Sequence, residues 1–171
     1  MDAGRTWRLI GHVGPALNGA DLGVTKIRFA TTQDGWVFGP QLWSTHDGGQ
    51  SWRQASQPQP VDDVEAAAGV AYAVEGDRLL RAPVGSDSWQ DVRQVGGGEV
   101  GGGEIALHGH AIWVVEANPA GAGKLAFSAD GVSWQQLPDP CARLGSPWAL
   151  SSVAPVTTAD VFLLCGGGAG A

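Results

Sequence analysis

The sequence predicts an all-β fold assembled from repeated four-stranded antiparallel units. A motif of eight residues recurs along the chain: a hydroxyl residue, any residue, Asp, any residue, Gly, any residue, a hydroxyl residue and Trp. The Trp residues that end its four copies stand 45, 37 and 45 positions apart, and a period near forty indicates a repeat architecture. Gly (27) and Pro (10) are abundant, so we expect many short strands joined by tight turns.

These copies, which we call corner motifs, are predicted to be structural. The copy at 45–52 is complete, the copy at 2–7 lacks its first two positions, the copy at 86–89 has lost its Gly, and the copy at 128–134 is one residue shorter. The Asp and hydroxyl oxygens are expected to accept N–H groups of their own loop, Gly to adopt a positive φ, and Trp to cover the turn. The assigned residues are Asp2, Gly4, Thr6, Trp7, Thr45, Asp47, Gly49, Ser51, Trp52, Asp87, Trp89, Ser128, Asp130, Gly131, Ser133 and Trp134.

In these copies the sequence resembles the Asp-box (BNR) repeat family of β-propellers. The resemblance covers nearly the whole chain, with one corner motif for each blade. It implies that the corners lie on the rim of the propeller, away from any active site, so the motif indicates the fold and says little about function. The piece 34–39 followed by a corner is most similar to non-enzymatic exported bacterial propellers and to propellers like the photosystem II assembly factor.

The best-defined unit covers residues 24–56. Residues 26–30 alternate and predict a first strand, and Asp34-Gly35 predicts a turn into a second strand at 36–38. Gly39-Pro40 marks the next turn, before a third strand at 41–44 and, after the corner, a fourth strand at 52–55. Four antiparallel strands in about thirty residues are the content of one blade.

The same order is expected along the rest of the chain, which we interpret as one domain forming part of a propeller. Strands are predicted at 64–68, 70–74, 78–82 and 89–92 in the blade 62–93, at 104–108, 111–116, 124–128 and 134–137 in the blade 104–138, and at 148–153 and 159–165 in the half blade 147–171. Residues 1–10 supply a corner and the last strand, 7–10, of a preceding blade. Aromatic residues of the second strands are predicted to pack between blades: Trp36, Tyr72, Trp113 and Phe162.

Counting strands predicts an open arc rather than a closed ring. The strand at 7–10 has no third strand to pair with, and the tail 166–171 is too short and Gly-rich to serve as one. We therefore expect about three complete blades with partial blades and unpaired edges at both ends, a tendency to aggregate, and a parent protein of about six or seven blades.

Composition argues against several classes of partner. A net charge of −7 and the lack of a basic stripe argue against nucleic acid. No apolar run approaches about 20 residues, so no membrane span is predicted.

No catalytic, cofactor-binding or metal-binding residue is predicted. His108 and His110 have the spacing of a metal pair, but Gly109 between them favours a turn and no third ligand is near in sequence. There is no G-x-S-x-G motif, and neither cysteine lies in a known nucleophile setting.

A glycosidase site is the main alternative, because Asp-box propellers include sialidases. Sialidases resemble one another in an aromatic-Arg-Ile-Pro motif, whereas Arg28 stands in Ile-Arg-Phe-Ala and the single tyrosine, Tyr72, lies in an apolar strand. Asp62, Asp63 and Glu65 either line the axial mouth or form a solvated loop before a strand, which we favour.

Cys141 and Cys165, 24 positions apart, are either a disulfide or two buried thiols. A bridge would add roughly 3 kcal/mol of stability under the loop-closure model. It would also indicate an oxidising compartment, extracellular or in the cell envelope.

The predicted function is a non-enzymatic scaffold or a module that binds an unknown protein or carbohydrate, without a cofactor. The alternative is a fragment of a sialidase-like glycoside hydrolase whose catalytic residues lie largely outside this chain. Fold alone does not decide between them.

Overall fold

Strands form nearly everywhere that the alternation of the sequence indicates. The computed structural model describes residues 6–10, 13, 24–56, 60–95, 103–116, 123–145 and 148–167. Asp2 and Gly4 of the first corner motif lie outside these residues. The described residues contain no helix long and apolar enough to cross a membrane.

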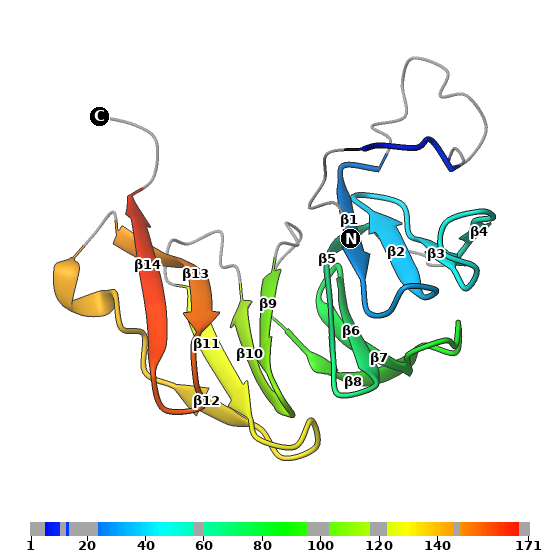
Figure 1. Ribbon diagram of the computed structural model, residues 1–171. Coiled ribbons are helices and arrows are strands. Elements are labelled where there is room, and N and C mark those ends of the chain that lie inside the picture. Colours follow the sequence, from blue (N-terminus) through cyan, green and yellow to red (C-terminus); the bar gives the residue numbers. More distant parts are fainter. Residues whose placement is uncertain are drawn as a thin grey trace.

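Four antiparallel sheets follow one another along the chain, each with its strands in sequence order (Figure 1). The first contains β1 (Lys26–Phe29), β2 (Gly35–Phe38), β3 (Trp43–Thr45) and β4 (Arg53–Gln54), and the second contains β5 (Val61–Ala67), β6 (Val70–Glu75), β7 (Arg78–Pro83) and β8 (Gln90–Gln94). The third contains β9 (Gly103–His108), β10 (Ala111–Glu116), β11 (Lys124–Ser128) and β12 (Gln135–Leu137). A short 3-10 turn, η1 (Ala142–Leu144), precedes the two strands of the fourth, β13 (Trp148–Pro155) and β14 (Val161–Gly167).

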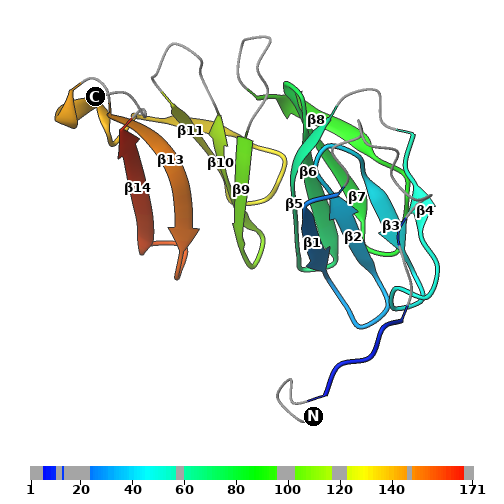
Figure 2. The same cartoon turned by 90° about the horizontal axis from the view of Figure 1, so that it is seen from above.

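The sheets are arranged as an arc, with the first sheet at one end and the fourth at the other (Figures 1 and 2). The first strands of neighbouring sheets lie beside one another and are tied by their acidic side chains. Asp63 of β5 accepts the backbone N–H of Ile105 in β9 at 2.8 Å. Glu104 of β9 accepts the Ser152 hydroxyl in β13 at 2.8 Å. This is the blade stacking of a propeller.

The apolar core lies between the sheets. Because side chains alternate across a strand, each second strand presents one row toward the following sheet. Trp36, Tyr72 and Trp113 occupy this row and belong to the three successive buried clusters. Phe162 holds the same position in the fourth sheet, where no described sheet follows, and is 67% exposed. The stacking of blades therefore accounts for burial of the first three aromatic residues.

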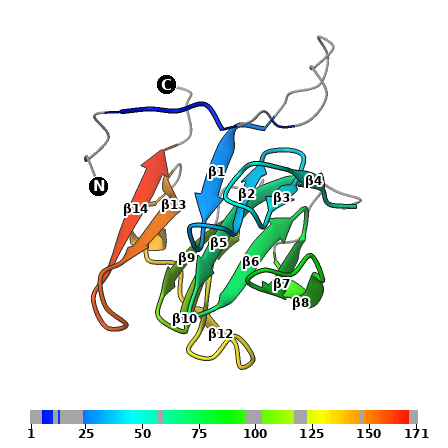
Figure 3. The same cartoon turned by 45° about the vertical axis from the view of Figure 1, so that its right-hand side comes forward.

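The N-terminal segment corrects one expectation. Residues 6–10 form no strand, so the strand predicted at 7–10 is wrong (Figure 3). A strand needs a hydrogen-bonded neighbour, and none of the described strands pairs with this segment. Trp7 is 92% exposed, so its ring is not buried against the described residues. Ile10 instead lies against the corner of the first sheet. If Gly49 carried a Cβ atom, that atom would lie 2.9 Å from the Cδ1 atom of Ile10.

Two kinds of turn join the first and second strands. In the first sheet the Thr31 hydroxyl accepts the Asp34 N–H at 2.8 Å and donates to the Asp34 carboxylate at 2.8 Å. Thr157 and Asp160 repeat this turn in the fourth sheet. The second and third sheets use two-residue turns instead, Ala68-Gly69 and Gly109-His110. The shared Thr-Thr-x-Asp pattern is a repeat signal that the corner motifs alone did not reveal.

Candidate ligand-binding site

The complete corner between β3 and β4 is closed by hydrogen bonds within its own loop. The buried Thr45 hydroxyl accepts the Gly49 N–H at 2.9 Å and donates to the Asp47 carboxylate at 2.8 Å. Asp47 also accepts the Ser51 N–H at 2.9 Å and the Ser51 hydroxyl. Trp52 returns over the turn, and its Nε1–H donates to the Gly49 carbonyl at 3.1 Å. Thus all five corner residues contribute to the loop.

The shortened corner between β11 and β12 uses the same chemistry with one residue fewer. The Ser128 hydroxyl accepts the Gly131 N–H at 2.8 Å. One carboxylate oxygen of Asp130 accepts the N–H groups of Val132 and Ser133, each at 2.8 Å. The missing residue therefore shortens the loop without removing its acceptors.

The incomplete corner between β7 and β8 is built differently. The Ser86 hydroxyl accepts the Ser88 N–H at 3.1 Å, whereas the Asp87 carboxylate lies 3.3 Å from Nε2 of His46 in the first sheet. The Trp89 ring packs against Trp36, with their ring centroids 6.3 Å apart. Its Nε1–H is buried without a partner within the described residues.

The carboxylates of the two closed corners remain ionised to low pH. Hydrogen bonds from Ser51, and then from Thr45, lower the pKa of Asp47 to about 2. The N–H groups of Ser133 and Val132, and then the Ser128 hydroxyl, lower the pKa of Asp130 to about 2. A carboxylate that is needed to hold its own loop is a poor general acid, because such an acid requires a raised pKa.

The acidic residues near the first strands are also engaged in structure. Burial raises the pKa values of Asp62, Asp63 and Glu65. Asp63 holds the third sheet, as described above, and Glu65 forms an ion pair with Arg28 of β1. Their places in β5 show that they are not the solvated loop that we favoured from the sequence.

Across the described residues, no group of three or more His, Cys, Asp or Glu side chains is placed to hold a metal ion. His108 ends β9 and His110 lies in the turn that follows, and both are exposed.

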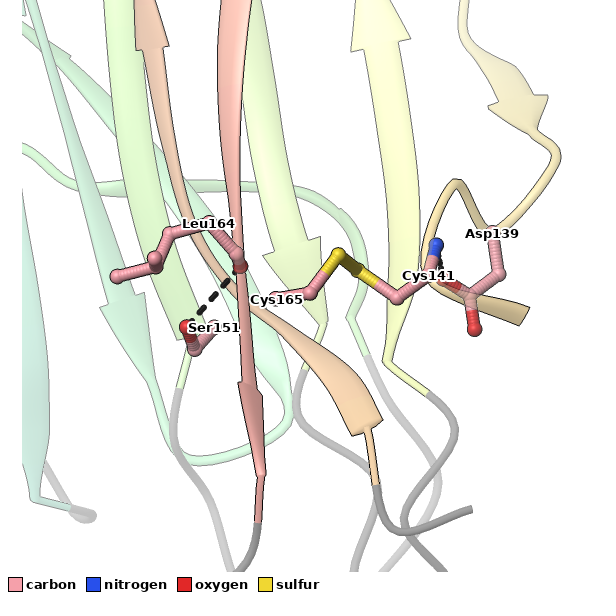
Figure 4. Close-up of a disulfide and its surroundings, with 5 residues drawn as sticks. All are labelled: Asp139, Cys141, Ser151, Leu164 and Cys165. Carbon is pink, nitrogen blue, oxygen red and sulfur yellow. Dashed lines mark hydrogen bonds between the residues drawn. A yellow bond between two sulfur atoms is a disulfide. The ribbon is translucent and has the colours of Figure 1, made fainter. Parts of the chain in front are cut away.

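Cys141 and Cys165 are joined by a disulfide between the segment before η1 and strand β14 (Figure 4). Their Cα atoms lie 5.7 Å apart. Cys141 is fully buried in the apolar cluster that contains Trp113, between the third and fourth sheets. The Asp139 carboxylate accepts the Cys141 N–H at 2.8 Å and holds this segment in place. The disulfide thus fixes the two-stranded fourth sheet to the segment that leaves the third.

A cavity of about 300 Å³ lies between the second and third sheets. Its lining includes residues that flank the β5–β6 turn, residues of the β9–β10 turn and one residue of the corner of the third sheet. Apolar side chains form most of its wall, and a few polar groups face them. The lining residues are Ala67, Val70, Tyr72, Arg81, Ala82, Pro83, Gln90, Leu107, Gly109, His110, Ile112 and Asp130. A volume of this size accommodates one or two amino-acid side chains or a small molecule.

Arg81 is the distinctive polar group of this cavity. It is half-buried, and within the described residues its guanidinium has no hydrogen bond or ion pair. Arg81 and Tyr72 are direct cross-strand partners in the β6–β7 hairpin. Burial raises the pKa of the Tyr72 hydroxyl, while the positive charge of Arg81 opposes the rise. A half-buried cation beside a neutral phenol in an apolar wall suits an anionic group attached to an apolar one.

Sequence reasoning did not identify this cavity. Tyr72 was assigned to the core, and Arg81 and His110 were not connected with it. The available signal was the hairpin itself, since a tight turn at 76–77 makes Tyr72 and Arg81 neighbours on one face. What the sequence did not indicate is the position of the third sheet, which supplies the opposite wall.

Comparison with known proteins gives matches among solved structures only. No family model matches the sequence, and no curated protein matches it. The structure is similar to YCF48 bound to D1 peptide (22% identity, TM-score 0.52, over 67% of this chain and 39% of that one). It is also similar to YCF48 from Cyanidioschyzon merolae (19% identity, TM-score 0.55, 75% and 45%) and to the N-terminal domain of Nup159 (13% identity, TM-score 0.57, 84% and 39%).

These similarities establish the β-propeller fold, and the fold class predicted from the sequence is confirmed. The chain spans less than half of the length of the YCF48 chains that it matches.

Proposed function

We propose that this chain is a non-enzymatic binding module that holds a segment of a protein partner in the cavity between the second and third sheets. The observation that carries the proposal is Arg81, a half-buried cation with no partner in the described part of the chain, set in a mostly apolar wall. The Asp130 carboxylate lines the same cavity but is held by the N–H groups of its own loop, so the placement of Arg81 favours a site for an anionic ligand group.

A peptide suits this cavity better than a sugar. The apolar side chains of Val70, Leu107 and Ile112 offer a surface for one apolar side chain, whereas a sugar needs a larger number of polar partners. The cavity lies at the turns, where an extended segment can reach it without entering the core. In the structure of YCF48 bound to D1 peptide, a propeller of similar fold has a peptide ligand. The proposed ligand is a segment with an acidic group beside an apolar side chain.

The glycoside hydrolase alternative has less support. A glycosidase needs two carboxyl groups across the scissile bond, one of them with a raised pKa. Among the described residues that line the cavity, Asp130 is the one carboxylate, and its own loop lowers its pKa to about 2.

The test is peptide binding with and without Arg81. Peptides selected from a random display library on the immobilised chain are synthesised, and their affinities are measured by titration calorimetry. Because a hydrogen bond to a charged group contributes about 1.5–3 kcal/mol, Arg81→Gln is expected to weaken binding about tenfold or more. Selected peptides should be enriched in acidic residues next to apolar ones.

A matched control is Arg143→Gln, which removes an exposed arginine of η1, remote from the cavity. Binding by this variant should equal that of the unchanged chain. Equal losses of affinity in the two variants, or selected peptides whose binding is weakened by neither change, would refute the proposed site.

A further inference from the structure

His46 connects two sheets from the variable second position of the complete corner motif. Its Nδ1 lies 2.9 Å from the Asp34 carboxylate, which belongs to the β1–β2 turn of its own sheet. Its Nε2 lies 3.3 Å from the Asp87 carboxylate, which belongs to the β7–β8 loop of the second sheet. The ring is 37% exposed, so protons exchange with solvent. One imidazole therefore bridges the boundary between two blades.

The chemistry of the two partners determines the protonation state that this bridge requires. An ionised carboxylate only accepts hydrogen bonds. Neutral imidazole has one N–H, so it can donate to Asp34 or to Asp87 but not to both. Both contacts are hydrogen bonds only when His46 carries two protons. The hydrogen bond and charge of His46 lower the pKa of Asp34, so that this acceptor stays ionised.

We propose that His46 is a proton-operated link between the first and second sheets, closed in the imidazolium form and open in the neutral form. Loss of a proton leaves one ring nitrogen facing a carboxylate with no hydrogen between them, which is repulsive. The Asp87 contact is the longer of the two and crosses between sheets, so it is the contact that opens. The Asp34 contact, within one sheet, remains.

Among the described residues, no other charged group near His46 takes the place of its contact with Asp87. Asp47, the next residue, uses its carboxylate to hold its own corner. Arg53 of β4 lines the same polar groove of about 510 Å³ as His46 and Asp87, and within the described residues the Arg53 guanidinium forms no ion pair. Opening the link therefore frees Asp87 in a groove that contains a cation. Protonation of His46 therefore determines the charge of this groove and whether its two walls are in contact.

The expected pH dependence follows from the direction of the shift. The Asp34 hydrogen bond, and more weakly the contacts with Asp87, raise the pKa of His46 above its ordinary value of 6.5, although burial opposes this. A raised pKa in the folded state means that the link stabilises the fold fully below 6.5. This contribution is lost as the pH rises through the raised value. The link is thus closed in mildly acidic solution.

The first test is a ¹H–¹⁵N long-range NMR titration of the full chain from pH 5 to 9. His46 should titrate above 6.5, the ordinary value for histidine. Below its pKa both ring nitrogens should give protonated signals, and above it only Nδ1 should. A His46 that titrates at or below 6.5, or one that retains its proton on Nε2 at high pH, would refute the proposal.

The second test is a double-mutant cycle of His46→Gln and Asp87→Ala, followed by urea unfolding at pH 5.5 and 8.5. At pH 5.5 the coupling should change the unfolding constant about 1.5- to 5-fold, the size of an exposed ion pair, and at pH 8.5 it should vanish. His108→Gln, combined with Asp87→Ala, should show no coupling at either pH. Coupling that is equal at the two pH values would contradict a proton-operated link. If a variant does not fold, the NMR titration of the unchanged chain decides.

Discussion

The complete corner of the first sheet and the incomplete corner of the second use the same residue types for different purposes. In the first, the Asp47 carboxylate is directed into its own loop, and the indole N–H of Trp52 closes the turn. In the second, Asp87 is directed toward the neighbouring sheet, and the indole N–H of Trp89 is buried without a partner among the described residues. Where the motif is complete its acid stabilises one blade, and where the motif is incomplete the acid is free to join two.

The largest loss of stability is expected from truncation of the two tryptophans. Trp89→Ala and Trp52→Ala should each lower the free energy of unfolding, by about 3–5 kcal/mol where the ring is well packed. Trp89 should be the more costly, because its ring packs against the fully buried Trp36 whereas Trp52 packs on the partly exposed Phe29. Urea unfolding checks the order, and a larger loss for Trp52 would contradict it.

The next largest effect is expected from removing the hydroxyl group of a corner, and it should differ between the two corners. Thr45 is 1% exposed, and Thr45→Val leaves the Gly49 N–H without its acceptor, so the expected loss is about 1–3 kcal/mol. Ser86→Ala is the matched change in the incomplete corner, where water can replace the hydroxyl because the Ser88 N–H is exposed. Its loss in urea unfolding should be smaller. Equal losses would show that the two corners are built alike.

The indole N–H groups give a smaller contrast. Trp52→Phe removes a hydrogen bond to the Gly49 carbonyl and should cost about 0.5–1.5 kcal/mol beyond the loss of ring size. Trp89→Phe removes an N–H that has no partner in the described residues, so this additional cost should be absent. The comparison is again made by urea unfolding. An additional cost at Trp89 would reveal a partner for that N–H.

The smallest effect is the pH dependence that Asp47 gives the complete corner. Because the pKa of Asp47 is lowered to about 2, its contribution is present above 3.8, the ordinary value, and is lost as the pH falls toward 2. Thermal unfolding between pH 5 and 2 should therefore show a shallower acid decline in Asp47→Asn than in the unchanged chain. Val132→Ala, which keeps the backbone N–H that donates to the Asp130 carboxylate, should leave the slope unchanged. Parallel curves for all three would refute the role given to Asp47.

The sequence was informative where structure depends on near neighbours. Strand β10 occurs at the predicted residues 111–116 and β11 at 124–128, because each hairpin is determined by alternation and by the turn beside it. The corner hydrogen bonds were foreseeable for the same reason, since Thr45, Asp47 and Ser51 lie within one loop.

Contacts between sheets were not foreseeable in the same way. The orientation of Asp87 toward His46 and the wall opposite Arg81 depend on how one blade stacks on the next. That stacking is determined by sheet twist and by many apolar side chains together, rather than by a local pattern. The strand expected at 7–10 failed because a short strand takes its stability from a neighbour, which its own residues do not specify.

The disulfide has a consequence for cleavage of the chain. Cys141 and Cys165 lie on opposite sides of the exposed β13–β14 turn, which includes Val156 at 60% exposure. A protease that cuts this turn separates the backbone into two pieces that remain covalently joined. The cut protein should migrate as one band in a denaturing gel without reductant and as two bands after reduction. The fourth sheet thus keeps its two strands together through a nick that would otherwise release one of them.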